Sequence, residues 1–233
     1  MKNNNANRGL PWVVLAGLTV ALSVRPTQAD VTLNQFNSAS EVSQQWRFDF
    51  GSATHSAVFD PGQDANGNSA SGSMKVTLGF NTTLGGENKV AYTRDIFPGL
   101  DGTTFSSMQM DVRVDPSSAL DAFGNNGFFG LAIRNTGSYD YFGQFGDNLH
   151  SADGWRHISV SPLTGTVNDI RGVTWQLYGG PMQNITGPVT LWFDNVSFTS
   201  VPEPSSLALA ALGALGLLLW RLRGTIFHSQ RSR

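Results

Sequence analysis

Two segments of the chain alternate apolar and polar residues with a period of two. Residues 74–80 carry Met, Val, Leu and Phe at every second position, and residues 108–114 repeat the pattern with Met and Val. This period is typical of a strand with one face on a core and the other in water. It favours β structure over helix for the centre of the chain.

Shorter apolar runs of the same kind follow one another along the chain, separated by clusters of Gly, Pro, Asn and Asp. They lie at residues 90–96, 128–134, 139–145, 155–161, 173–178 and 189–198. Eight or nine short strands, with one short helix expected at residues 39–46, predict an all-β fold. The expected architecture is a two-sheet antiparallel sandwich.

The composition excludes several classes of protein. The chain has no cysteine, which removes disulfides, thiolate nucleophiles and cysteine metal clusters. Residues 30–199 contain sixteen acidic and eight basic side chains, so this part of the chain has a net charge of −8. A field of this sign disfavours phosphate backbones, and we expect no nucleic-acid partner.

The first 29 residues have the order of a secretory signal peptide. Basic Lys2 and Arg8 precede an apolar run at residues 12–22, and the small residue Ala29 follows. Eleven residues form a helix only about 17 Å long, which is too short for the ~30 Å hydrocarbon core of a bilayer. We therefore expect a helical signal peptide that is cleaved between Ala29 and Asp30.

The other end of the chain has three parts in a fixed order. These are Val201, Pro202, Glu203 and Pro204, then an apolar run at residues 207–220, then Arg221 and Arg223. Proline lacks a backbone donor and fixes φ, so residues 200–206 are predicted to be a linker after a domain at residues 30–199. The apolar run and its arginines predict a transmembrane helix at residues 207–223 and a short cytoplasmic tail at residues 224–233.

This three-part end resembles the PEP-CTERM sorting signal of Gram-negative bacteria that make exopolysaccharide. The resemblance implies that an exosortase, an integral-membrane processing enzyme, recognises the Pro-Glu-Pro motif. It also implies export, with an intermediate in the inner membrane and a final place at the cell surface or outside the cell. Residues 224–233 are a departure, since members of the family usually end soon after their arginines. A permanent single-span anchor is the alternative.

Three further motifs occur in the order and spacing of a second family. They are Ser-Gly-Ser-Met-Lys-Val at residues 71–76, Gly-Trp-Arg-His-Ile-Ser-Val at residues 154–160 and Leu-Trp-Phe-Asp-Asn-Val at residues 191–196. Together they resemble carbohydrate-binding modules with a galactose-binding-like sandwich, over most of residues 30–199. The resemblance implies a jelly roll with one structural calcium ion.

In that family the calcium ligands are the aspartate of the last motif, carbonyl groups near the first motif, and an acidic residue after an early Phe. The matching positions here are Asp194, Ser73 and Asn37. Asn37 offers only an amide oxygen in place of a carboxylate, whereas calcium takes six to eight oxygens, several of them from carboxylates. Without calcium, we expect Asp194 to bond backbone groups at a sheet edge.

Candidates for catalysis are few. The chain has only three glutamates, Glu41, Glu87 and Glu203, for the carboxylate pair that glycoside hydrolysis requires. The Gly-x-Ser-x-Gly elbow of serine hydrolases does not occur in the sequence. We therefore predict a protein that is not an enzyme, with a glycoside hydrolase as the less favoured alternative.

Binding is easier to support than catalysis. In each predicted strand, the residues that alternate with the apolar ones point away from the core. This alternation selects four candidate ligand-binding residues: Arg113, Arg134, Gln176 and Tyr178. A loop expected at the rim of the sheet adds a fifth, Tyr141. If their strands share one sheet, its outer face combines planar hydrogen-bonding groups with aromatic rings, which suit a sugar. The predicted ligand is extracellular polysaccharide; the alternative is a structural biofilm or floc matrix protein without a small ligand.

Overall fold

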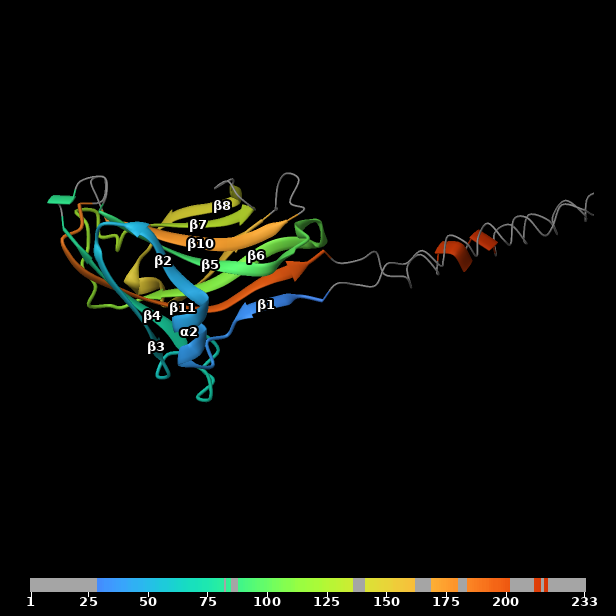
Figure 1. The fold of residues 1–233 in the computed structure, drawn as a ribbon, viewed down its shortest axis with the longest axis horizontal. Helices are drawn as coiled ribbons and strands as arrows, with labels where there is room; N and C mark the ends of the chain where they lie inside the picture. Colours follow the sequence, from blue (N-terminus) through green and yellow to red (C-terminus); the bar gives the residue numbers. More distant parts are fainter. Residues whose placement is uncertain are drawn as a thin grey trace, which may run out of the picture. The chain divides into compact units, whose positions relative to one another are not determined.

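The computed structural model describes residues 29–81, 83–84, 88–135, 141–161, 169–179, 184–201, 212–214 and 216–217. Residues 29–201 form one compact unit (Figure 1). The predicted signal peptide, the Pro-Glu-Pro motif, most of the predicted membrane helix and the predicted cytoplasmic tail lie outside the described residues. In the part of the chain that is described, no helix is long and apolar enough to cross a membrane.

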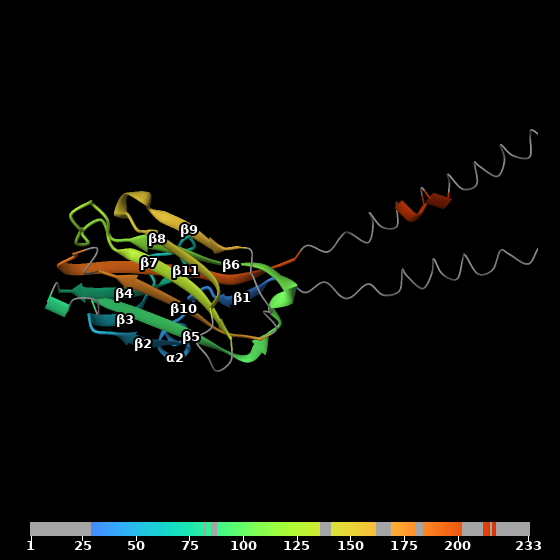
Figure 2. The same ribbon diagram turned by 90° about the horizontal axis from the view of Figure 1, so that it is seen from above.

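Two antiparallel sheets form the compact unit, which confirms the predicted all-β sandwich (Figure 1 and Figure 2). Sheet A has the strand order β3-β4-β11-β6-β9, and β1 also pairs with β11. Its strands are β1 (Val31–Asn34), β3 (Thr54–Asp60), β4 (Ser73–Phe80), β6 (Phe105–Val114), β9 (Trp155–Val160) and β11 (Gly187–Ser200). Sheet B has the order β2-β5-β10-β7-β8. Its strands are β2 (Trp46–Gly51), β5 (Lys89–Leu100), β7 (Phe128–Asn135), β8 (Tyr141–Asn148) and β10 (Ile170–Tyr178).

Helical structure within the compact unit is short. Its complete elements in the described residues are α2 (Ala39–Gln45) and the 3-10 turns η2 (Gly102–Thr104) and η3 (Ser151–Asp153). The helix expected at residues 39–46 is therefore present, but Trp46 is already the first residue of β2. The Trp46 side chain is buried and its indole N–H donates to Asn34 Oδ1 at 3.0 Å. Packing against β1 thus turns this residue from helix to strand.

The core lies between the two sheets and contains the apolar residues that the period-two pattern selects. Met74, Val76 and Leu78 of β4 are completely buried. Between the sheets, the Trp175 ring of β10 stacks on the Phe193 ring of β11, with 4.4 Å between their centroids. Stacked aromatic pairs of this kind contribute about 0.5–1.5 kcal/mol beyond the burial of their surface.

Both ends of the compact unit lie at the same end of sheet A (Figure 1). The Asp30 carboxylate accepts hydrogen bonds from the backbone N–H of Ser200 at 2.7 Å and from its hydroxyl at 2.9 Å. The next residue, Val201, donates its N–H to the carbonyl oxygen of Thr104 at 2.9 Å. The backbone is therefore hydrogen-bonded to the sandwich up to the residue that precedes the Pro-Glu-Pro motif.

Candidate functional site

On the outer face of sheet B, the small residues Ala91, Gly130 and Gly146 form one row with Gln176 across four strands. We call this row the floor. In register, Ala91 of β5 lies beside Gln176 of β10, Gln176 beside Gly130 of β7, and Gly130 beside Gly146 of β8. A Cβ atom on Gly130 would lie 3.1 Å from the Gln176 side chain, so this glycine lets the amide lie close to the sheet. The floor forms a shallow hollow of about 220 Å³ next to Gln176 and Phe128.

Aromatic side chains line one side of this floor. Tyr178 lies in register between Lys89 and Phe128, and the Tyr178 and Phe128 ring centroids are 6.4 Å apart. The Lys89 Nζ atom lies 5.9 Å from the centre of the Tyr178 ring. Phe128 keeps 37% of its surface exposed. This aromatic row presents apolar ring surface beside a positive charge, which suits the apolar side of a sugar ring.

Charged side chains line the other side of the floor. Arg47 donates through Nε to Asp95 at 2.8 Å and through Nη1 to Asp49 at 3.0 Å. Arg134 donates through Nη2 to Asp95 at 3.1 Å, and its Nη1 atom lies 3.9 Å from Asp49. The Thr93 hydroxyl also donates to Asp49, at 2.9 Å. Two guanidinium groups and two carboxylates thus form one network of balanced charge, which we call the charged cluster.

Exposure separates the roles of the two arginines in the charged cluster. The Arg47 side chain is 50% exposed, whereas that of Arg134 is 11% exposed. The hydrogen bond to Asp95 raises the pKa of Arg47 further above its ordinary value, so this group stays charged. Arg47 is therefore placed to meet a ligand, and Arg134 holds the two aspartates in position.

Four of the five predicted ligand-binding residues belong to sheet B. They lie on three neighbouring strands of sheet B: Arg134, Tyr141, Gln176 and Tyr178. Arg113 does not join them, because β6 belongs to sheet A, so the condition that all these strands share one sheet is not met. Its guanidinium donates to Gln63 Oε1 at 2.6 Å and lies 5.6 Å from the centre of the Trp192 ring. A period of two tells which way a side chain points from the core, but not which sheet its strand joins.

Among the residues of this face that were not predicted from the sequence are Phe128, Arg47 and Asp95. Phe128 has the parity of Arg134 within the same apolar run, so that signal was sufficient to select it. Arg47 lies on β2, which shows no clean alternation of buried and exposed residues. Asp95 reaches the site only because β5 pairs with both β2 and β10, which is a long-range contact.

The predicted calcium ligand Asp194 is completely buried on β11. Its Oδ2 atom accepts the N–H of Ala65 at 2.9 Å, and Oδ1 accepts the N–H of Asn195 at 2.7 Å. Burial nevertheless raises the pKa of Asp194 to about 6, and the carboxylates of Asp64 and Asp111 add to the rise. Asp194 therefore does bond backbone groups, but the expected position at a sheet edge is wrong, because β11 lies between β4 and β6 in sheet A.

The other two predicted calcium ligands differ in their surroundings. Ser73 Oγ is buried without a hydrogen-bond partner among the described residues, whereas the Asn37 N–H donates to Glu41 Oε1 at 2.9 Å. No group of three His, Cys, Asp or Glu side chains in the described ranges is placed to hold a metal ion. Calcium stays a prediction, tested by measuring the Tm during calcium titration.

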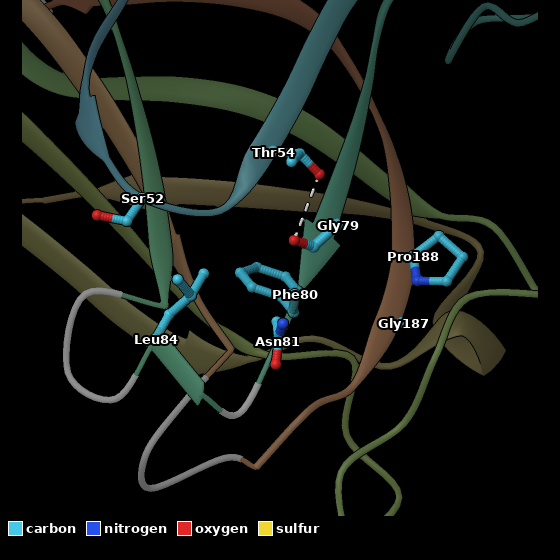
Figure 3. Close-up of a pocket in the computed structure, with 8 residues that line it drawn as sticks. All are labelled: Ser52, Thr54, Gly79, Phe80, Asn81, Leu84, Gly187 and Pro188. Atoms are coloured by element: carbon cyan, nitrogen blue, oxygen red, sulfur yellow. Dashed lines mark hydrogen bonds between the residues drawn. The ribbon is translucent and has the colours of Figure 1, made fainter.

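A larger hollow of about 430 Å³ lies where β4 ends and β11 begins (Figure 3). Thr54, Gly79 and Pro188 lie in register across its three strands, and the Thr54 hydroxyl donates to the Gly79 carbonyl oxygen at 3.5 Å. Phe80 and Leu84 supply apolar surface. None of the described residues that line this hollow is charged. It lacks the charged cluster and the exposed ring of sheet B, so sheet B is the better candidate for a ligand.

A family model for the PEP-CTERM protein-sorting motif matches residues 200–223. The match contains all the predicted sorting residues and confirms that prediction: Val201, Pro202, Glu203, Pro204, Arg221 and Arg223. The motif indicates export through the membrane-associated exosortase system. A search of curated proteins gave no match.

Several solved structures are similar to the compact unit. Carbohydrate-binding module 27-1 of Caldicellulosiruptor saccharolyticus, solved with mannohexaose, aligns with a TM-score of 0.52 at 15% identity, over 74% of this chain and 97% of that chain. A family 28 module specific for non-crystalline cellulose aligns with a TM-score of 0.51 at 14% identity, over 75% of this chain and 97% of that chain. The family 11 module of Clostridium thermocellum was solved with a β-1,3-1,4-mixed-linked tetrasaccharide. It aligns with a TM-score of 0.50 at 14% identity, over 76% of this chain and 99% of that chain. The chain therefore carries a PEP-CTERM protein-sorting motif after a β-sandwich with the fold of carbohydrate-binding modules.

Proposed function

We propose that this protein is an exported surface or extracellular-matrix protein whose β-sandwich binds polysaccharide without catalysis. The observation that carries the proposal is the outer face of sheet B, where an aromatic row and a charged cluster flank a floor of small residues. The apolar side of a sugar ring packs on Phe128 and Tyr178. Its hydroxyl groups bond Gln176, Arg47 and Asp95.

The balanced charge of the cluster favours a neutral glycan. A sugar hydroxyl donates one hydrogen bond and accepts others, so it matches a site where Arg47 supplies donors beside the acceptors of Asp95. The similar solved modules were crystallised with neutral oligosaccharides or are specific for cellulose, which supports the same class of ligand.

The carboxylate of Glu41 supports a non-catalytic role. Its Oε2 atom accepts the Asn34 side-chain amide at 3.2 Å and the Phe36 N–H at 3.1 Å, and its Oε1 atom accepts the Asn37 N–H. Both oxygens thus hold the segment that links β1 to α2. Glycoside hydrolysis would need a carboxyl group that meets the glycosidic bond.

The C-terminal motif determines where the protein is exported. An exosortase-type enzyme acts on the motif at residues 200–223 while the chain is held in the inner membrane of a Gram-negative bacterium. The protein then reaches the cell surface or the extracellular matrix. There the polysaccharide that such cells secrete is the natural ligand for the sheet B face.

Affinity electrophoresis tests the binding proposal. The full-length chain is purified in a detergent without a sugar headgroup and run through gels that contain cellulose derivatives, mannan, mixed-linked glucan or the host's own exopolysaccharide. We expect at least one polysaccharide to retard the wild type, and Tyr178→Ala to lose most of this retardation. Val58→Ala, an exposed site on β3 of sheet A, is the control and keeps it. Equal migration of the wild type in every gel would refute the proposal.

A structural matrix protein without a small ligand is the second candidate, and one surface residue favours it. Phe123 is 82% exposed, yet its loop is held by Asp121, whose Oδ1 atom accepts the N–H groups of Phe123 and Asn125 at 2.8 Å each. An exposed ring on a loop whose backbone is held by hydrogen bonds suits a protein contact. Analytical ultracentrifugation tests it: self-association that Phe123→Ala abolishes supports the matrix role, and a monomer at all concentrations rejects it.

A further inference from the structure

A second polar hollow adjoins the charged cluster. It has a volume of about 400 Å³ and is lined by residues of α2, β2 and β5, which lie close together in Figure 2. Its walls include Gln44 and Gln45 of the helix, with Arg47, Asp95 and Phe97 of the strands. Arg47 and Asp95 also belong to the charged cluster, so the hollow continues the sheet B face around its edge.

Phe97 gives this hollow an aromatic surface of its own. It is 79% exposed, about twice as much as Phe128 in the aromatic row. An apolar ring left in water beside arginine, carboxylate and amide groups repeats the combination found at Tyr178 and Gln176. The hollow therefore has the chemistry of a sugar subsite.

The polar groups around Phe97 are held in place by their neighbours. Gln45 Oε1 accepts a hydrogen bond from the Asn34 amide at 2.9 Å and another from Arg94 Nη1 at 2.6 Å. Arg94 Nε is buried and has no hydrogen-bond partner among the described residues. Gln44 is exposed next to them. A ligand hydroxyl would thus meet groups that need little reordering, which lowers the entropic cost of binding.

Distance sets the kind of ligand that can use both aromatic surfaces. Lys89, which lies beside Tyr178, and Phe97 are separated by eight positions of β5. This is at most about 26 Å at the rise of a strand, because the pairing of β5 with β10 shifts in register beyond Asp95. A disaccharide reaches only one of the two surfaces. A long glycan spans both, and the second contact then forms within one complex at a high effective concentration.

We propose that the hollow between α2 and β5, with Phe97 as its stacking ring, is a second saccharide subsite that makes the domain select extended chains. This inference rests on the proposed function, because it requires a glycan on the outer face of sheet B. It assigns to Phe97, Gln44 and Gln45 a role in preference for ligand length. Tyr178 and Phe128 contribute to binding of short and long chains alike.

Calorimetric titration of the full-length chain tests the inference. The probes are long and disaccharide-sized fragments made by partial hydrolysis of the polysaccharide that retards the protein in gels. We expect the wild type to bind long fragments about tenfold more tightly than disaccharides. Phe97→Ala loses about tenfold in affinity for long fragments and keeps that for disaccharides. Val58→Ala, which changes an exposed apolar residue of β3 outside the hollow, matches the wild type on both probes.

The outcomes separate the two proposals. Wild-type affinity of Phe97→Ala for long fragments, together with loss of all binding in Tyr178→Ala, overturns the subsite and leaves the proposed function standing. Failure of the wild type to bind any polysaccharide overturns both. Because Phe97 is exposed, an unchanged Tm of Phe97→Ala verifies that the variant is folded.

Discussion

Gly146 controls how the Phe128 ring lies on sheet B. A Cβ atom at this position would lie 2.8 Å from the nearest carbon of the ring, closer than such contacts allow. Gly146→Ala therefore forces the ring away from the floor. We expect polysaccharide binding to weaken severalfold, while stability falls by about 1 kcal/mol.

The control for this change is Gly62→Ala in the loop between β3 and β4. Its Cβ atom would have only Asp60 Oδ1 near it, at 3.3 Å, and it lies in sheet A's connection rather than on sheet B. Affinity electrophoresis and thermal unfolding measure both variants. Unaltered binding by Gly146→Ala would show that the Phe128 ring does not contact the ligand.

Asp194 makes the stability of the sandwich depend on pH. Its pKa is raised by burial from 3.8 to about 6, so the folded state holds this proton more tightly than the unfolded state. The contribution is fully present below pH 3.8 and is lost as the pH rises through 6, at a total cost of roughly 3 kcal/mol. Asp194→Asn removes this dependence.

Urea unfolding at a series of pH values, with EDTA present, measures the effect. The free energy of unfolding of the wild type should decline more steeply between pH 4 and about 6.5 than that of Asp194→Asn. Parallel curves for the two proteins would mean that Asp194 titrates near its ordinary pKa. EDTA ensures that a bound cation does not neutralise the carboxylate.

At the scale of elements, the strands predicted from the sequence are the ones with two different faces. The eight predicted runs correspond to β4 through β11, because each of these strands lies on the core with one face. β3 was missed because Thr54, His55, Ser56 and Val58 are all exposed, so its sequence has no period. β1 is only four residues long and is held by pairing with β11. Long-range pairing, rather than local pattern, makes these strands.

The loop between β6 and β7 depends on one aspartate. Burial opposes ionisation of Asp121, but hydrogen bonds from Asn125, Phe123 and Gly124 outweigh it and lower its pKa. We expect Asp121→Ala to reduce stability by about 1–3 kcal/mol, because several loop N–H groups lose their acceptor. Thermal unfolding of Asp121→Ala and Asp121→Asn at pH 7 measures this loss.

Acid should reduce the stabilising contribution of Asp121. The pKa of Asp121 is lowered, so its stabilising contribution is present above pH 3.8 and is lost as the pH falls through the folded-state value. The difference in stability between wild type and Asp121→Ala should therefore shrink in acid. A difference that stayed constant down to pH 2 would show that the charge of Asp121 is not what holds the loop.

At the scale of the whole molecule, the sorting motif and the proposed binding face belong to separate parts of the chain. Only Val201 separates β11 from the Pro-Glu-Pro motif. Replacing Pro202, Glu203 and Pro204 by alanine removes the motif and leaves the sandwich unchanged. We expect this variant to remain in the inner-membrane fraction while the wild type is recovered beyond it. Cell fractionation with immunoblotting measures the distribution, and identical distributions would contradict the sorting role.

Only part of the proposed binding face could be predicted from the sequence, because some of its features depend on local pattern and others on long-range strand pairing. The outward direction of Arg134, Gln176 and Tyr178 is local, since it depends on the alternation within each strand. The partnership of Arg47 with Asp95 depends on the pairing of β2 with β5, and the position of Arg113 depends on β6 joining sheet A. Local patterns therefore select side chains for a face, and strand order decides which of them meet.

The central claim is that polysaccharide binds on the outer face of sheet B. Calorimetric titration of the host's exopolysaccharide into the full-length wild type and a Phe128→Ala, Tyr178→Ala double variant tests it most directly. We expect saturable binding by the wild type and affinity at least about tenfold weaker in the double variant, because two ring surfaces are lost. Equal affinities, with both proteins folded by thermal unfolding, would contradict the claim and place the ligand elsewhere on the sandwich.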